Sequence, residues 1–402
     1  MLAQEISREA MSRNASFPEH LLQAAAHPDP YPYYAALLAY RPIYREEKIG
    51  LWVALGADEA AAVLDSPLCR VRPPVEPVPA NIAGSSAGNV FGHLVRMNDG
   101  DRHRVLKPAV AATIGAFDPG ALIGAARRIA AACLEESGAG ASGIDRFARA
   151  FPVRAIAEMI GLPAKAAPMA AALIADFTRC LSPLSSPAQI ESSKSAAARL
   201  LHLLEEQSDG KQRGGVPMQM DRLMSLGVAQ REAALANLLG LMSQTYEATA
   251  GLIGNTLLAL ARDTDLQRRA AGDDALLHRI VGEVLRHDPP VHNTRRFVAE
   301  DGIVAGQEMK AGDTILVVLA AANRDPALHA RPHLFDPDRA DQSCFTFGHG
   351  RHACPGAAIA MELAAIGVQA LMARGAAFDD LLRAVRYAAS VNARIPIFGE
   401  PA

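Results

Sequence analysis

The sequence predicts a mainly α-helical protein with small β-sheets, and three features of its 402 residues indicate this class. Long segments rich in alanine, leucine and arginine carry apolar residues at helical spacing, and proline and glycine interrupt them. Residues 232–262 contain no proline and are apolar on nearly all sides, which is typical of a helix in the middle of a protein. Residues 41–64 read as two short strands followed by a helix that we expect to be capped near Asp58, so a small sheet lies near the N-terminus.

Charge and hydropathy exclude several kinds of partner. The chain has 40 Lys and Arg against 43 Asp and Glu, so no excess of positive charge points to nucleic acid. The longest apolar run, residues 314–322, is far shorter than the roughly 20 residues that span a bilayer. Residues 1–17 hold charges but no apolar core of a signal peptide. We expect a cytoplasmic protein with one domain over residues 1–402 and no membrane anchor.

The cysteines predict neither a disulfide framework nor a zinc site. There are five of them, an odd number in a chain large enough to fold without disulfides. The spacing between Cys344 and Cys354 matches neither a zinc knuckle nor a redox pair. We expect most of the five to be small buried side chains.

Residues 71–93 predict a long loop. Prolines and glycines interrupt every regular period in this stretch. A loop of this length inside a compact domain is usually functional or disordered.

The stretch FTFGHGRHACPG, residues 345–356, holds a single cysteine among glycines and basic residues. An apolar helix follows it, so Cys354 lies just ahead of a helix N-terminus, where partial positive charge and backbone N–H groups favour a thiolate. The glycines allow a flat ligand to approach the backbone closely. A buried structural cysteine is the alternative, but the composition of the loop favours a thiolate ligand of haem iron.

This loop resembles the cysteine-ligand loop of the cytochrome P450 superfamily, and further landmarks of the family follow in order along nearly the whole chain. The resemblance implies the cytochrome P450 fold, a single domain with a long central helix over the haem. It implies haem b (iron protoporphyrin IX) as the cofactor and Cys354 as the ligand of its iron. It also implies haem contacts from Phe347, Gly348, His352 and Gly356.

The resemblance implies a structural triad that supports the haem loop. Glu283 and Arg286 lie three apart on one helix face, where a carboxylate and a guanidinium can pair. Arg339, in the stretch FDPDR, joins this pair in the family. From the spacing alone, an exposed ion pair between Glu283 and Arg286 is the alternative.

Four basic residues are implied as partners of the two haem propionates: His103, Lys107, Arg296 and His352. His103 and Lys107 are four apart and share a helix face. Pro108 follows directly, and we expect it to kink or end that helix. A solvated surface charge is the alternative for each basic residue taken alone.

Residues 243–249 resemble the oxygen-binding groove of the family, in which an acid precedes a threonine. The acid is present as Glu247, the candidate for proton relay, whereas Ala248 replaces the alcohol that delivers protons to dioxygen. Thr249 is rotated by about 100° around the helix, so Gln244, one turn before Ala248, is the better substitute. A substrate hydroxyl or carboxylate could also complete the path. For Glu247, a hydrogen bond between helices is the structural alternative.

The resemblance also places a substrate pocket, built from Thr245, Val291, His292, Asn293, Val391 and Asn392. His292, Asn293 and Asn392 could orient the polar end of a hydrophobic substrate, or could be ordinary loop residues. The polar stretch around Glu247 faintly resembles bacterial relatives that oxidise terpenoid acids such as gibberellin precursors, which implies a substrate of that kind.

No flavin or iron–sulfur module follows the cysteine helix, so we expect electrons from a separate ferredoxin and ferredoxin reductase. Arg102, Arg104, His349 and Arg351 could form a basic surface for an acidic ferredoxin, or a plain solvated face. The sequence thus predicts a haem-thiolate monooxygenase. A peroxide-driven or carbon–carbon-cleaving variant and a non-catalytic haem-thiolate sensor or binding protein remain open.

Overall fold

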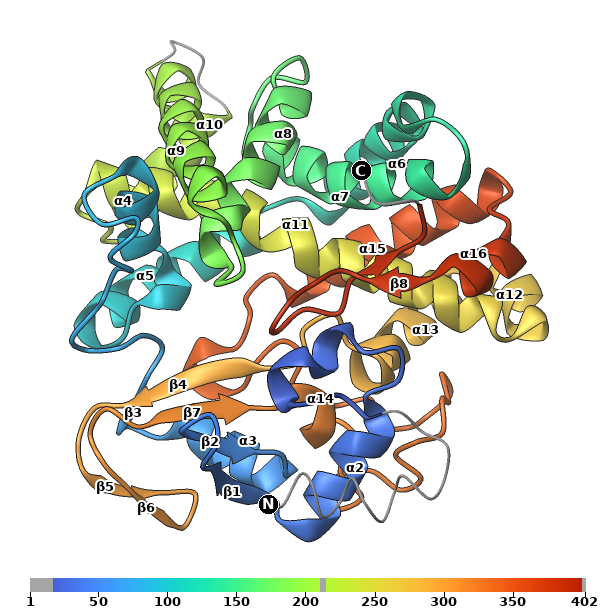
Figure 1. Ribbon diagram of the computed structural model, residues 1–402. Coiled ribbons are helices and arrows are strands. Elements are labelled where there is room, and N and C mark those ends of the chain that lie inside the picture. Colours follow the sequence, from blue (N-terminus) through green and yellow to red (C-terminus); the bar gives the residue numbers. More distant parts are fainter. Residues whose placement is uncertain (1–16, 210–214, 400–402) are drawn as a thin grey trace. The chain divides into compact units, whose positions relative to one another are not determined.

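The computed structural model describes residues 17–209 and 215–399, and these are mainly helical with small sheets, as the sequence predicts. They fall into two compact units, each described here by itself (Figure 1). Unit 1 is formed by Met1–Pro74, Gly254–Cys354 and Leu381–Phe398. Unit 2 is formed by Val75–Ile253, Pro355–Asp380 and Gly399–Ala402. The first sixteen residues, over which we expect no signal peptide, lie outside the described part.

Unit 1 holds the sheets and the shorter helices. Its helices are η2 (Leu21–Ala26), α2 (Tyr31–Tyr40), α3 (Ala57–Asp65), α12 (Thr264–Ala270), α13 (Asp274–His287), α14 (Leu319–Ala322) and η5 (Gly350–His352). Its strands are β1 (Ile43–Glu46), β2 (Leu51–Ala54), β3 (Cys69–Arg70), β4 (Thr294–Val298), β5 (Gly302–Val304), β6 (Gln307–Met309), β7 (Thr314–Val317), β8 (Arg386–Tyr387) and β9 (Pro396–Ile397). Helix α16 (Phe378–Ala384) crosses from unit 2 into unit 1.

The main sheet of unit 1 has the strand order β1-β2-β7-β4-β3, in which β2 and β7 are parallel and the other pairs antiparallel. Strand β7 is buried on both faces because successive side chains point to opposite sides. Ile315 and Val317 pack with Val63 of α3, whereas Leu316 packs with Leu37 of α2. Each face of the sheet is therefore covered by a helix.

The early helix begins close to the predicted position near Asp58. Helix α3 begins at Ala57 with Gly56 as its N-cap residue, and Asp58 lies in its first turn. An acid in the first turn still stabilises the helix, because it interacts with the positive end of the helix dipole.

The prediction of a loop over residues 71–93 is wrong in part, because the last third of this stretch is a helix. Helix α4 (Ser86–His93) begins after Ser85, whose hydroxyl accepts the N–H of Gly88 at 3.2 Å. Gly88 is required here, since a Cβ would lie 2.2 Å from the carbonyl oxygen of Ile82. Glycine disfavours a helix in sequence reasoning, but here Gly88 allows the helix to pack closely against the backbone of Ile82.

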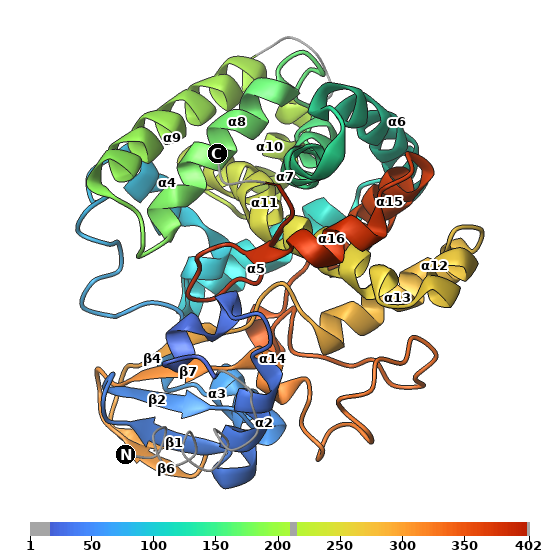
Figure 2. The ribbon, with the colours of Figure 1, turned by 45° about the vertical axis from the view of Figure 1, so that its right-hand side comes forward.

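Unit 2 is a set of helices around the long helix α11. They are η3 (Val95–Met97), α5 (Gly100–Gly115), α6 (Pro119–Ser137), α7 (Gly140–Met159), α8 (Ala167–Thr178), η4 (Arg179–Leu181), α9 (Pro187–Ser208), α10 (Val216–Ser225) and α15 (Ala357–Ala373), with α4 described above. In Figure 2, α8 and α9 lie side by side, as do α6 and α7. None of the helices in the described part is both long and apolar enough to cross a bilayer by itself.

Helix α11 (Arg231–Ala261) confirms the predicted long helix. Its first 23 residues belong to unit 2 and the rest to unit 1. Leu238, Leu239 and Ile253 are fully buried, as expected for a helix that is apolar on all sides. In unit 2, Ile253 also limits the space at Gly367 of α15, where a Cβ would lie 2.9 Å from its Cδ1 atom.

Two neutral histidines lie in unit 1, and of these His292 is fully buried and His287 half-buried. His287 accepts a hydrogen bond from Arg324 at Nδ1 and donates from Nε2 to the carbonyl of His333. His292 has Tyr34 Oη 3.1 Å from Nδ1 and Tyr31 Oη 3.4 Å from Nε2. Burial is the main reason why the pKa of each histidine falls to about 3.

We expect the protein to lose stability on acidification already at a pH well above the pKa of its carboxylates. The unfolded chain protonates these two imidazoles near pH 6.5, whereas the folded chain does so only near pH 3. The free energy of unfolding should therefore fall by about 2 kcal/mol for each imidazole between pH 7 and pH 5. Urea unfolding at both pH values measures this. The His292→Gln variant should show a smaller pH dependence, and the exposed control His20→Gln the same dependence as the parent; an unchanged dependence in His292→Gln would contradict the assignment.

Candidate active site

The cysteine loop of unit 1 is held by short backbone hydrogen bonds. The N–H of Cys354 donates to the carbonyl of Phe347 at 2.7 Å, and that of Gly348 donates to Phe345 at 2.7 Å. Gly348 and Gly350 have φ of 76° and 61°, a region that favours glycine. These turns leave Cys354 exposed, three residues before α15 begins.

A chain of hydrogen bonds ties this loop to helix α13. Thr346 Oγ1 donates to the carbonyl of Leu285 at 2.6 Å and accepts from Asn323 Nδ2 at 2.9 Å. Asn323 Oδ1 in turn accepts the N–H of Phe345 at 2.7 Å. Sequence reasoning missed Thr346 and Asn323, because neither stands at a spacing that links it to Cys354.

The predicted triad is formed and buried. Arg286 donates to both carboxylate oxygens of Glu283, at 2.6 and 2.9 Å, and neither side chain is exposed at all. Arg339 Nε lies 3.6 Å from Glu283 Oε1, which also accepts the N–H of Asp336 at 2.9 Å. The alternative of an exposed ion pair is therefore wrong, because neither side chain is exposed and the carboxylate has partners both on its own helix and in the segment 336–339.

The loop is also fastened to the end of helix α3. Arg351 Nη2 donates to the carbonyl of Ser66 at 2.5 Å, and His349 Nε2 lies 3.1 Å from Asp65 Oδ2. Gly350 allows this approach, since a Cβ there would lie 1.6 Å from Asp65 Oδ1. His349 and Arg351 thus have partners within unit 1, which leaves less of their charge for the predicted ferredoxin surface. In unit 2, Arg104 pairs with Asp101.

The predicted propionate partners belong to both units. In unit 1, Arg296 lies on β4 and is buried, with Nη1 donating to the carbonyl of Arg295 at 2.9 Å, and His352 ends η5. In unit 2, His103 is buried on α5, and Lys107 lies on the same helix.

Pro108 does not end the helix that carries Lys107. Helix α5 continues through Pro108 to Gly115, so the expected break is wrong in that respect. Proline removes one N–H donor, but the rest of the helix still buries Ala109, Val110 and Thr113. Packing of that face outweighs the lost hydrogen bond.

Two polar side chains of α11, those of Thr245 and Gln244, form hydrogen bonds with the backbone of the same helix. Thr245 Oγ1 donates to the carbonyl of Leu241 at 2.6 Å, and Gln244 Nε2 donates to Gly240 at 2.9 Å. Gln244 is exposed, whereas Thr249 is 2% exposed. Gln244 is therefore the more open of the two candidates to replace the missing alcohol at Ala248.

Glu247 lies in a basic neighbourhood of unit 2. Glu247 is partly accessible to water, but the protein atoms around its carboxyl reduce its hydration. This loss of hydration is the main reason why the pKa of the carboxyl is raised. Three arginines oppose this rise in pKa: Arg149, Arg96 and Arg179. Sequence reasoning missed them, since they come from three separate helices. A carboxyl with a raised pKa that faces cations is suited to holding and passing a proton.

The substrate residues predicted in unit 1 pair with one another. The N–H of His292 donates to the carbonyl of Asn392 at 2.8 Å, and Asn293 Nδ2 donates to that of Val391 at 2.8 Å. Val291 forms a bridge with Ala393. His292 is fully buried between two tyrosines, an environment that favours its structural alternative. Thr245 belongs to unit 2.

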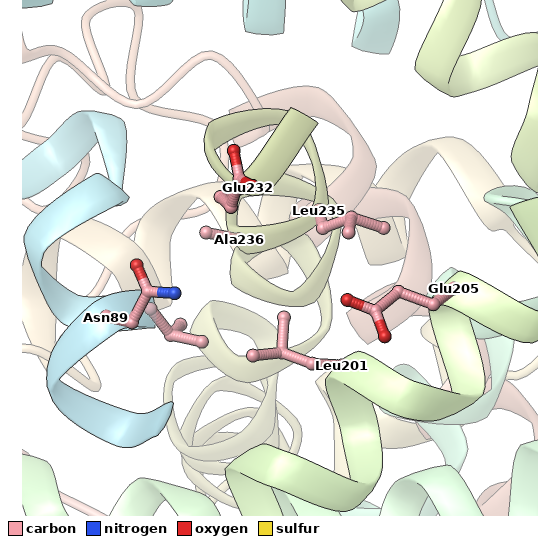
Figure 3. A pocket seen from close by; sticks show the side chains of 7 residues that line it. Asn89, Leu201, Glu205, Glu232, Leu235 and Ala236 are labelled. Carbon is pink, nitrogen blue, oxygen red and sulfur yellow. The ribbon is translucent and has the colours of Figure 1, made fainter. Parts of the chain in front are cut away.

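A small cavity of about 30 Å³ in unit 2 contains none of the predicted residues. Figure 3 shows Asn89 of α4, Leu201 and Glu205 of α9, and Glu232 and Leu235 of α11 around it. It has room for about one water molecule.

The donor set around Cys354 fits a metal that brings most of its own ligands. Among residues 17–209 and 215–399, no group of three or more His, Cys, Asp or Glu side chains could hold a metal ion. A porphyrin brings four nitrogens of its own, and the exposed sulfur of Cys354 would supply the ligand from the protein. The propionate partners predicted from the sequence are Arg296 and His352 in unit 1 and His103 and Lys107 in unit 2. The fold and these residues define the haem-thiolate class of protein.

Comparison with known proteins identifies the family. The model of the family "Cytochrome P450" matches residues 185–373. The chain is 30% identical over 360 residues to the cytochrome P450 monooxygenase PikC of Streptomyces venezuelae, covering 86% of this chain and 84% of that protein. It is 28% identical over 359 residues to the biotin biosynthesis cytochrome P450 of Bacillus subtilis, covering 86% and 89%. The solved structure of epothilone B-bound cytochrome P450epoK has a TM-score of 0.79 at 20% identity, covering 94% and 99%.

The chain belongs to the cytochrome P450 family. It is a monooxygenase of the bacterial type, an oxidoreductase, and its cofactor is haem (iron protoporphyrin IX). The fold predicted from the resemblance is confirmed.

Proposed function

We propose that this enzyme inserts oxygen into a hydrophobic small molecule in the cytoplasm, with electrons from a separate ferredoxin and its reductase. The exposed Cys354 carries the proposal, because a buried network fixes the loop that presents it. The described cysteines form no disulfide, which fits a reducing compartment. Two relatives bear the names of a monooxygenase and of a 6-deoxyerythronolide B hydroxylase, the latter from Saccharopolyspora erythraea at 27% identity, which supports hydroxylation.

We assign a separate role to each part of the site. Haem, when bound, supplies the activation of dioxygen. Cys354 would hold the iron, and the predicted cations Arg296, His352, His103 and Lys107 would bind the propionates. Glu247 passes protons. Loss of hydration raises the pKa of its carboxyl, and the neighbouring arginines limit this rise. Gln244 offers an amide close to the position where the family has an alcohol.

The substrate that we propose is a terpenoid acid, of which gibberellin precursors are examples. The support is the polar stretch of α11, together with the cationic surroundings of Glu247, which suit an acidic ligand better than a neutral one. Titration of the haem-loaded enzyme with a panel of diterpenoid acids tests this. A substrate should shift the spin state of the iron, and a panel without any shift would remove the terpenoid class.

Turnover experiments separate this function from its alternatives. Product formed with ferredoxin, reductase and NAD(P)H supports the monooxygenase. Product formed with hydrogen peroxide alone indicates the peroxide-driven variant, and a cleaved carbon skeleton among the products indicates the carbon–carbon-cleaving one. Ligand binding without product under either condition indicates a sensor or binding protein.

Restoring the family's alcohol with Ala248→Thr should raise the yield of product per NAD(P)H only for substrates without a hydroxyl or carboxylate. The reason is that the hydroxyl of Thr245 donates its hydrogen bond to the carbonyl of Leu241. A polar substrate must therefore complete the proton path itself. We expect a several-fold rise for neutral substrates and little change for polar ones. Ala248→Val, which has the shape of threonine without the hydroxyl, is the control. A several-fold rise regardless of substrate would remove the case for substrate assistance.

A further inference from the structure

Two polar side chains of unit 1 that have no role in the proposed chemistry cap the C-terminal end of helix α13. The last four carbonyls of a helix have no partner in its regular hydrogen-bond pattern, and that of Leu285 is one of them. Thr346 Oγ1 donates to this carbonyl at 2.6 Å, and Asn323 Nδ2 donates to it at 3.2 Å. Asn323 is not exposed at all and Thr346 is 8% exposed, so both hydrogen bonds are shielded from water.

The same two residues attach the start of the cysteine loop to that helix end. Asn323 Oδ1 accepts the N–H of Phe345 at 2.7 Å, and Asn323 Nδ2 also donates to Thr346 Oγ1 at 2.9 Å. Thr346 is itself a residue of the loop, eight positions before Cys354. The loop is therefore anchored at two successive residues, Phe345 and Thr346.

The anchor is connected to the buried ion pair of α13. Arg286, which pairs with Glu283 out of contact with water, also donates from Nη1 to the carbonyl of Asn323 at 3.3 Å. Asn323 is thus held through its backbone by the ion pair and holds the loop through its side chain.

Hydrogen bonds inside the loop extend from the anchor to Cys354. The carbonyl of Phe345 accepts the N–H of Gly348 at 2.7 Å, and that of Phe347 accepts the N–H of Cys354 at 2.7 Å. Between Phe345 and Cys354 the only regular element is the three-residue helix η5, so these few hydrogen bonds determine the shape of the loop. A shift of Phe345 or Thr346 should therefore move the backbone of Cys354.

Apolar packing of Phe345 is the competing explanation of how the loop is held. Phe345 is 9% exposed and belongs to the same buried cluster as Leu64 and Leu319. Such packing is non-directional, so it keeps the ring buried without fixing the direction of the neighbouring backbone. The hydrogen bonds of 2.6, 2.7 and 2.9 Å made by Thr346 and Asn323 do fix a direction.

We propose that Thr346 and Asn323 are positioning residues that hold Cys354 in the orientation in which its sulfur ligates the haem iron. This rests on the proposed function, in which Cys354 is the ligand. Without the anchor, Arg351 still fastens a later part of the loop to the carbonyl of Ser66, so the protein should fold. The sulfur of such a protein would be held less precisely and would leave the iron more readily.

The test compares Thr346→Val, which keeps the shape of threonine without its hydroxyl, with Thr346→Ser, which keeps the hydroxyl. The reduced, haem-loaded enzyme is held under carbon monoxide in increasing concentrations of urea. The red-shifted absorption reports thiolate ligation, and far-ultraviolet circular dichroism reports helix content. In urea too dilute to change the helix content, Thr346→Val should lower the ratio of thiolate-ligated to other haem by about tenfold, the effect of one hydrogen bond. Thr346→Ser should behave like the parent, and Asn323→Ala should change the ratio in the same direction as Thr346→Val.

Thr178→Val on α8 of unit 2 is the matched control, because it is the same substitution at the same exposure of 8%. It removes a hydrogen bond from Thr178 Oγ1 to the carbonyl of Ala175, 3.1 Å long. Any loss of stability in this variant should affect the red-shifted absorption and the helix content together, at the same urea concentration.

The same coincident loss in Thr346→Val would show that Thr346 only stabilises the fold, and would overturn the proposal. Equal effects of Thr346→Val and Thr346→Ser would also overturn it, because the hydroxyl would then not be the cause. If Thr346→Val does not fold, Thr346→Ala, which cannot clash, is read in the same way. A parent enzyme without the red-shifted absorption refutes Cys354 as the ligand together with its positioning, whereas a parent with this absorption and a coincident loss in Thr346→Val refutes the positioning alone.

Discussion

Cys354→Ser is expected to abolish the red-shifted absorption of the reduced enzyme under carbon monoxide, and with it all product formation. A serine hydroxyl stays protonated at neutral pH and cannot donate electron density to iron as a thiolate does. The backbone of the loop should persist, because the hydrogen bonds from Thr346 and Asn323 do not involve the sulfur. Absorption spectra of the reduced protein with and without carbon monoxide measure the change.

The control is Cys344→Ser, ten residues earlier in the same segment. Cys344 is half-buried, whereas Cys354 is exposed, so this variant should keep the parental spectrum. Retention of the red-shifted band in Cys354→Ser would mean that another residue ligates the iron, and the assignment of the site would then be wrong.

Arg286→Met is expected to lower the free energy of unfolding by about 3–5 kcal/mol and to produce protein that retains little haem. Arg286 neutralises the fully buried Glu283 and also donates to the carbonyls of Pro332 and Leu334, at 2.8 and 3.0 Å. Methionine fills the space but leaves the carboxylate with Arg339, 3.6 Å away, as its nearest cation. Denaturant unfolding and the ratio of haem to protein measure the two effects.

Arg279→Met provides a matched control on the same helix. Arg279 pairs with Asp338 at 3.1 Å, but both side chains are largely exposed, so its loss should cost less than about 1 kcal/mol. Similar losses in the two variants would show that burial of the Glu283 pair does not set its contribution.

The sequence predicted those features whose cause lies within a short stretch of chain. Helix α11 is recognisable because its apolar residues continue without proline over nearly nine turns. The pairing of Glu283 with Arg286 follows from their spacing on one helix. The cysteine loop could be recognised because three glycines and the cysteine stand within a dozen residues, and two of these glycines do have positive φ.

Features that depend on contacts between distant segments could not be predicted. Asn323 and Thr346 look unremarkable in sequence, and only the packing of α13 against the loop gives them a role. Gly88 argued against a helix because the closeness of Ile82 was not visible.

The buried contacts of Arg394 constrain when unit 1 can finish folding. Its guanidinium donates to Asp288 and to the carbonyls of His27 and Pro28, at 2.8, 2.6 and 2.8 Å. On the ribosome, the segment that contains His27 emerges long before residue 394 has been translated. Nascent unit 1 therefore lacks this cation beside Asp288 until residue 394 has been translated and has left the ribosome.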